Sequence, residues 1–464
     1  MLREIVEKEL KECVYGYRSL LIFVLSVALF AVAIYTGCRE YQAALQEYRL
    51  AQVAQRQQAA EQTNLYALGN FGFDVVKPPQ VLGILVSGVE PHTPRVFNVA
   101  LFTLLEPRGS AAGESPISAV FGVLDLCFIV QVVLGLAALL FTFSTLCGEK
   151  ETGTLKLQLA NALPRDVLLL GKLVGNLIGL LVPVAVAFVL GCLLLLSFDD
   201  VSLSHKDMLR ILLLGVVFLL YLTVLFALGV FVSALTTRST TAFALCLAAW
   251  VVLVVITPKF AVLAAKHISP LESLQEFEQK KVAVHRQGSV EAQQEYAQYV
   301  REHRREMPPL AVYFAMTSRV REKQNRELAK IEDDYLQRKQ RQQRWVLGLS
   351  RLSPAGSASY GAMSLARTGL ERDFRFQAAL REYRAEFTRF YDRKSRELVA
   401  LTQDGAIGSA TIKQDLSDLP GLQFYEEPLS ASLDRALPDM GFLIVWSLGL
   451  FVAAYFSFLR YDVR

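Results

Sequence analysis

The sequence predicts an all-α integral membrane protein with six transmembrane helices, an amphipathic N-terminal interfacial helix and a large helical extracytoplasmic domain. Of the 464 residues, 53% are hydrophobic and the mean hydropathy is +0.34, whereas soluble domains contain roughly 45–50% apolar residues. Six separate stretches are also long and apolar enough to cross a bilayer, which requires about 20 residues of helix because backbone groups find no water there.

The predicted spans share long apolar runs with few charges, and they are residues 18–37, 117–146, 167–198, 209–235, 240–263 and 440–459. Residues 1–17 precede them and place Leu2, Ile5, Val6 and Leu10 among charges at helical spacing. This pattern is typical of an amphipathic helix lying on a membrane surface. Residues 38–116 and 264–439 are the two long connections, and 460–464 form a short tail.

An even number of spans puts both termini on one side of the membrane, and the distribution of basic residues predicts that this side is cytoplasmic. With the termini inside, the short inner segments carry Arg3, Lys8, Lys11, Arg18, Lys150, Lys156, Arg165, Arg238, Arg460 and Arg464. The short outer loop at 197–209 carries three aspartates and one lysine. This asymmetry obeys the positive-inside rule, from which loops much longer than ~60 residues are exempt. We therefore expect a bacterial cytoplasmic (inner) membrane protein with both termini cytoplasmic.

The two long connections have apolar residues at helical spacing, which predicts long amphipathic helices outside the membrane. These stripes are Tyr41, Leu45, Tyr48 and Ala51; Leu274, Phe277, Lys281 and Val284; and Phe376, Leu380, Tyr383, Phe387 and Phe390. A small-residue helix is also predicted between Ser353-Pro354 and Gly369, with an N-cap, a first-turn proline and a terminal glycine. It either rests on the outer membrane surface or belongs to the outer domain.

The loop at 147–166, between the second and third predicted spans, has the most specific motif of the chain. It reads Cys-Gly-Glu-Lys-Glu-Thr-Gly-Thr-Leu from Cys147 to Leu155, then reaches Pro164-Arg165, and Gly171-Lys172 follow at the start of the next span. This run resembles the signature of ABC type-2 (ABC-2, type V exporter-like) permeases in order and spacing. Nearly the whole chain is similar to the branch with a large extracytoplasmic insertion between spans five and six, and to nitrous-oxide-reductase-maturation-type permeases.

The resemblance implies that this loop is a coupling helix that receives motion from a cytoplasmic ABC ATPase. The residues that match the motif, and that we expect to couple, are Gly148, Glu149, Glu151, Gly153, Thr154, Leu155, Pro164 and Arg165. It also implies two ATPase copies and a second permease copy or a homologue, with a homodimer expected. No GxxxxGK[ST] phosphate loop occurs in the sequence, so ATP and Mg²⁺ are expected on the partner ATPase and no cofactor on this chain.

Three polar residues within the predicted spans are candidates for a transport pathway. Asp125 is the one carboxylate in the second span, where a charge is costly unless it faces a partner, a cavity or water. A position near the outer interface, where it only anchors the helix, is an equal alternative. Gln131 and Trp250 are weaker candidates, because the resemblance implies that spans two and five line a cavity at the dimer axis.

Composition excludes several other classes of function. The six cysteines have no paired spacing and the five histidines are dispersed, so neither a metal site nor a histidine base is predicted. The net charge of +4 is spread over the chain, which argues against nucleic-acid binding. No catalytic residue is assigned, because no nucleophile elbow or HExxH motif accompanies the spans.

Two hypotheses for function remain. The chain is the permease of an exporter for an unknown substrate, or it is a mechanical transmitter that remodels an extracytoplasmic partner protein without moving a solute. The size of the outer region motivates the second hypothesis.

Overall fold

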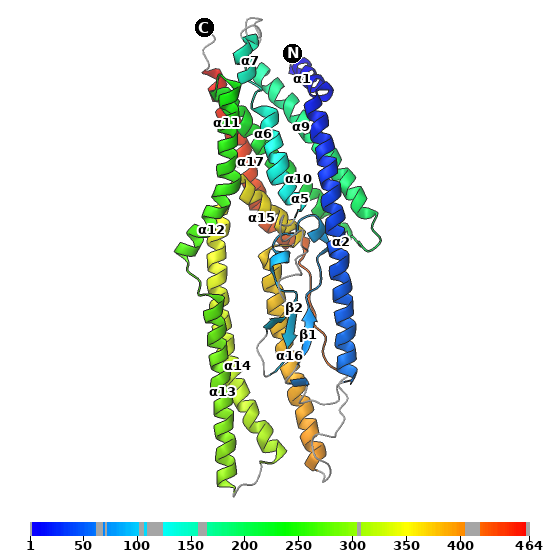
Figure 1. The fold of residues 1–464 in the computed structure, drawn as a ribbon, viewed down its shortest axis with the longest axis vertical. Coiled ribbons are helices and arrows are strands. Elements are labelled where there is room, and N and C mark those ends of the chain that lie inside the picture. Colours follow the sequence, from blue (N-terminus) through cyan, green and yellow to red (C-terminus); the bar gives the residue numbers. More distant parts are fainter. Residues whose placement is uncertain are drawn as a thin grey trace.

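The computed structural model describes residues 2–61, 68–69, 72–101, 106–108, 124–155, 165–303, 308–403 and 418–460. Within these ranges, six helices are long and apolar enough to span a membrane: Ser19–Ala54, Leu126–Thr152, Val167–Leu196, His205–Leu235, Ser239–Ile268 and Leu429–Leu459. The predicted class and the number of spans are confirmed. Both termini lie at one end of the elongated molecule (Figure 1). We call that end the terminal end, and the region beyond the spans at the opposite end the distal region.

Helix α10 (His205–Leu235) is the centre of the membrane bundle. It packs against α9 (Arg165–Leu196), α6 (Gly135–Thr142) and α17 (Leu429–Leu459). Most of its C-terminal half is fully buried, including Tyr221 and Phe226. Gly229 lets α6 approach α10 closely, since a Cβ there would meet the Oγ1 of Thr142 at 1.9 Å. A helix that is apolar on all sides is expected at such a central position.

Helix α1 (Leu2–Tyr15) packs against α9, and two glycines of α9 permit this contact. A Cβ at Gly171 would meet Ile5 Cγ2 at 2.6 Å, and one at Gly175 would meet Glu9 Cβ at 2.6 Å. Glycines four residues apart lie on one face of a helix and let a second helix approach closely. The apolar face of α1 therefore contacts a membrane-spanning helix of its own chain.

Two spanning helices change to π-helical geometry partway along. The second span consists of α5 (Leu126–Phe128), the π-helix η3 (Ile129–Leu134) and α6, and α7 (Cys147–Thr152) extends it at its terminal end. The fifth consists of α11 (Ser239–Trp250), the π-helix η4 (Val251–Ile256) and α12 (Thr257–Ile268). Such turns free carbonyl groups from the regular helical pattern. The short helix α15 (Pro354–Ala366) contacts η4, α10 and α17.

Helix α15 is the small-residue helix that the sequence predicted, and it packs into the membrane bundle. Its residues Ala355, Ala358 and Ala362 are buried against the bundle. Ser353 caps it as expected, accepting hydrogen bonds from the amides of Ala355 and Gly356. The predicted terminal glycine is wrong in detail, because Arg367 takes the left-handed conformation (φ 59°) that ends the helix. Small side chains allow α15 to enter between the larger helices.

The distal region is built from long helices. Helix α2 (Tyr17–Glu61) continues from the membrane into it without a break, and α13 (Leu274–Glu302) and α14 (Leu310–Ser350) form an antiparallel pair beside α16 (Leu370–Gln403) (Figure 1). The predicted stripe on α16 is confirmed, since Phe376, Leu380 and Phe387 are buried. The stripe on α13 is confirmed in part, because Phe277 is buried while Leu274 is 64% exposed.

A small antiparallel sheet in the distal region was not predicted. Its strands β1 (Phe73–Val76), β2 (Val96–Val99) and β3 (Glu106–Arg108) lie in that order, with Phe73 opposite Val99 and Val96 opposite Arg108. The sheet covers the aromatic stripe of α16, and the ring of Phe73 meets that of Phe387 at 5.2 Å. This packing forms a second hydrophobic core, separate from that of the bundle.

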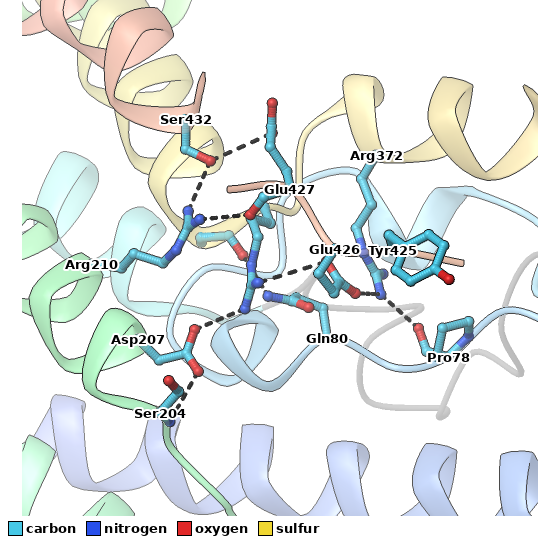
Figure 2. A network of polar contacts seen from close by, with 12 residues as sticks. Pro78, Gln80, Ser204, Asp207, Arg210, Arg372, Tyr425, Glu426, Glu427 and Ser432 are labelled. Atoms are coloured by element: carbon cyan, nitrogen blue, oxygen red, sulfur yellow. Dashed lines mark hydrogen bonds and ion pairs between the residues drawn. The ribbon is translucent and has the colours of Figure 1, made fainter. Parts of the chain in front are cut away.

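Arginines join the distal region to the bundle (Figure 2). Arg210 of α10 is buried and donates hydrogen bonds to Ser432 Oγ (2.8 Å), Leu365 O (3.1 Å) and Glu427 O (2.9 Å). Arg372 of α16 donates to Pro78 O (2.8 Å) and to Glu426 (2.9 Å). Arg210 thus ties α10 to α17 and to the segment before it, and Arg372 ties α16 to that same segment. We call this level of the molecule the arginine junction.

Candidate functional site

Helix α7 holds the first half of the sequence motif, at the terminal end of the bundle (Figure 1). Its N-terminus is fixed to α10, because the amides of Leu146 and Cys147 both donate to the buried Ser233 Oγ at 2.9 Å. A single hydroxyl thus satisfies two of the amides that a helix start leaves unpaired. The position of α7 consequently follows that of the last turn of α10.

Gly153 ends α7 in the left-handed conformation, with φ 76°. A Cβ there would meet nothing within 4 Å, so backbone geometry and not space requires the glycine. The next two motif residues continue the turn: Thr154 Oγ1 donates to Glu149 O (3.4 Å), and Leu155 is fully buried. Gly148 has room for a side chain, since a Cβ there would lie 3.7 Å from the Cβ of Ser144.

Replacing Gly153 by Val is expected to lower the stability of the folded protein by about 1–2 kcal/mol, the usual cost of a side chain in left-handed geometry. The measurement is the thermal unfolding midpoint of the purified chain in detergent. Gly148→Ala is the matched control, because its new methyl group makes only ordinary contacts. If the two variants have equal unfolding midpoints, the backbone at position 153 does not require glycine.

Glu149 enters a buried ion cluster that joins three elements. Its Oε1 lies 2.5 Å from Lys172 Nζ of α9, and the same ammonium lies 3.0 Å from Glu9 Oε1 of α1. Asn176 Nδ2 donates to Glu9 Oε2 at 3.1 Å. We call these four residues the Lys172 cluster. The Lys172 side chain is only 4% exposed, so the two carboxylates provide the compensating charge that a buried ammonium needs.

The other two charges of α7 contact the ends of α10 and α11. Lys150 Nζ donates to Thr236 O (3.1 Å) and to Ala234 O at the C-terminus of α10. Glu151 Oε2 accepts from both the amide (3.0 Å) and the hydroxyl (2.8 Å) of Ser239, the first residue of α11. A cation at a helix C-terminus and a carboxylate at an N-terminus each complement the helix dipole. The side chains of α7 therefore contact α9, α10 and α11 directly, and they reach α1 only through Lys172.

The rest of the motif is only partly visible. Pro164 lies outside the described residues, as does most of the predicted coupling helix, and of Arg165 the structure describes the backbone, which begins α9. Sequence reasoning did not identify Glu9 or Asn176. The available signal was the pair of glycines in α9, which indicates close packing of a second helix on the face that carries Lys172.

Asp125 lies at the start of the second spanning helix and not within its body. It is the N-cap of α5: Oδ1 accepts from the Phe128 amide (2.8 Å), and Oδ2 accepts from the amide (3.0 Å) and hydroxyl (2.9 Å) of Ser87. These bonds fix the helix to the segment after β1. They are the contacts expected of a residue that anchors a helix end.

Gln131 lies within the π-helix η3, and Trp250 directly precedes the π-helix η4. Gln131 Nε2 donates to Ser359 Oγ (2.6 Å) and Ala355 O (3.1 Å) of α15, while its carbonyl accepts from Tyr221 (2.9 Å). Trp250 is partly buried, and its Nε1 has no acceptor among the described residues. Gln131 thus holds α15 in place. Within the described residues, no group of three or more His, Cys, Asp or Glu side chains is placed to hold a metal ion.

Six candidate spans, three of which contact the charged side chains of α7, define this chain as a multi-pass membrane protein. The profile of the ABC-2 family transporter proteins matches residues 3–463. The chain therefore belongs to the ABC-2 family and is a membrane permease component of an ABC transporter. No curated protein matches it at a significant level.

Proposed function

We propose that this chain couples ATP hydrolysis by a separate cytoplasmic ATPase to the export of a substrate across a bacterial inner membrane. The observation that carries the proposal is the set of contacts of α7. Its three charged side chains bind α9, α10 and α11, and Lys172 of α9 links Glu149 to Glu9 of α1. A force applied to this loop from the cytoplasm would reach each of these helices through short hydrogen bonds and ion pairs.

Both termini and α7 then lie in the cytoplasm, in keeping with the distribution of basic residues. Two ATPase subunits carry the ATP and Mg²⁺, and two permease copies, or one copy and a relative, form the pathway. Glu151 is exposed and remains accessible to the ATPase beside its own contact with Ser239. Charges of this kind set the register of a contact more than its affinity.

Substitution of Glu149 tests the coupling role of α7. Glu149→Gln keeps the shape of the side chain but removes one of the two charges facing Lys172. We expect normal membrane insertion and at least about a fivefold loss of ATPase turnover or of ATPase co-purification. A loss of this size corresponds to a coupling free energy of about 1 kcal/mol or more. Glu12→Gln on the exposed face of α1 is the matched control. Unchanged co-purification and turnover in Glu149→Gln would contradict the role.

A second candidate function is mechanical transmission to a protein on the distal side. The unbroken α2, 45 residues long, and the arginine junction favour it, because both connect the membrane bundle directly to the distal region. The two functions separate in proteoliposomes that contain the permease and its ATPase. Export predicts ATPase stimulation and accumulation of a solute. If only a distal partner protein stimulates turnover and no solute moves, the export proposal is wrong.

A further inference from the structure

The spanning helices contain an apolar cavity of about 360 Å³ between α2, α9 and α10. Its inner wall is buried and consists of hydrocarbon side chains, among them Phe30, Val184, Ile211 and Phe218. Its rim is exposed and equally apolar, and is formed by Val189, Leu193, Leu196, Met208, Leu212 and Val216. A cavity that opens sideways from three spanning helices faces the bilayer interior, where the available ligands are lipids.

The extent of the cavity along the helices matches one leaflet. On α9 it reaches from Leu196, the last residue of the helix, back to Val184, and on α10 from Met208 to Leu219. At a rise of 1.5 Å per residue, these stretches are each about 17 Å long. Half of the ~30 Å hydrocarbon core is about 15 Å. The cavity therefore covers the depth of the leaflet next to the distal region and ends near the membrane midplane.

Aromatic rings define the inner wall at the deep end. Phe188 meets Phe30 with ring centroids 6.5 Å apart and Phe218 at 6.2 Å, both edge to face. Gly215 leaves the space that the Phe188 ring uses, since a Cβ there would lie 2.9 Å from Cε1 of Phe188. Edge-to-face rings are a stable arrangement, so this wall is a fixed surface and not a gap between mobile side chains.

One lysine lies near the level of the cavity's mouth. The exposed Lys206 is in the first turn of α10, two residues before Met208 of the rim and on another face of the helix. Two of the nearby acids are engaged: Asp207 pairs with Arg367 (2.8 Å), and Asp200 accepts from Gln42 (3.1 Å). The third, Asp199, is exposed. A lysine at a helix N-terminus at headgroup level attracts an anionic group.

We propose that this cavity binds one acyl chain of a phospholipid from the distal leaflet, with the lipid phosphate at the level of Lys206. Contacts of this kind give modest affinity, because lipid tails and the cavity wall are equally apolar and only packing distinguishes them. The site requires neither ATP nor a partner subunit. It therefore stands independently of the export and mechanical hypotheses.

The test uses the full chain in nanodiscs with a phospholipid that carries a nitroxide near the end of one acyl chain. We expect the spectrum to contain an immobilised component that exceeds the contribution of the ordinary annular lipids by about one lipid per chain. Val189→Trp at the rim and Ala185→Phe on the wall are expected to reduce this component at least about threefold, because packing alone retains the lipid. Val445→Trp, on the exposed face of α17 and outside the cavity, is the matched control.

Two arms of this experiment distinguish the occupants. Unlabelled phospholipid should displace the immobilised probe, and Lys206→Gln should weaken the retention of anionic phospholipids more than that of zwitterionic ones. The proposal is overturned if the wild-type chain immobilises no more probe than the two cavity variants. It is also overturned if only a sterol displaces the probe, or if the immobilised component disappears when two copies of the chain associate.

Discussion

Replacing Lys172 by Met is expected to destabilise the protein by about 3–5 kcal/mol, the usual consequence of removing one partner from a buried ionic group. The substitution leaves Glu9 and Glu149 without the ammonium that lies 3.0 and 2.5 Å from them. Two carboxylates that share a poorly hydrated site repel one another. We expect α1 and α7 to separate from α9, and the thermal unfolding midpoint in detergent to fall markedly.

A matched control and a rescue make this prediction specific. Lys8→Met removes a lysine from the same region, but its ion pair with Glu12 is about 60% exposed on both sides, and such pairs contribute little. Adding Glu9→Gln to Lys172→Met removes one of the two uncompensated charges and should recover part of the lost stability. An unfolding midpoint for Lys172→Met equal to that of Lys8→Met would show that the cluster is not a structural link.

The Lys172 cluster shows how far the sequence predicts this site. The motif from Gly148 to Leu155 identified Glu149 from the sequence alone, because a signature consists of residues that are neighbours in the chain. Glu9 could not be paired with Lys172 in the same way, because 163 positions separate them and periodicity describes only one element at a time. Only the packing of α1 on the glycines of α9 brings them together.

The fold was predictable to a similar extent. Long apolar runs define the spans because each one must satisfy its own backbone in lipid, and the aromatic stripe of α16 identifies its buried face. The sheet was missed because its strands have only three or four residues and a run of that length has little periodicity. The location of α15 was missed because small residues permit burial without requiring it. The sequence left two positions open for Asp125, since its bonds to Ser87 join residues 38 positions apart.

Replacing Arg210 by Met is expected to separate the distal region from the bundle. The substitution removes the donors that satisfy Leu365 O, Glu427 O and Ser432 Oγ, at a site where Arg210 is only 2% exposed. Buried acceptors that lose a charged donor cost about 1–3 kcal/mol each, so we expect a loss of about 3 kcal/mol or more. The measurement is the thermal unfolding midpoint, combined with limited proteolysis of the segment between α16 and α17.

The matched control for Arg210→Met is Lys206, one turn earlier on the same helix. Lys206→Met also removes a positive charge from α10, but its side chain is exposed, so stability should change little. Cleavage before Leu429 should accelerate in Arg210→Met and not in Lys206→Met, because Arg210 holds Glu427 and Ser432 on either side of the start of α17. If the unfolding midpoint falls but cleavage before Leu429 is no faster, Arg210 stabilises only the bundle and does not hold the distal region. In that case the distal region would follow the movements of α10 through the Arg367–Asp207 ion pair instead.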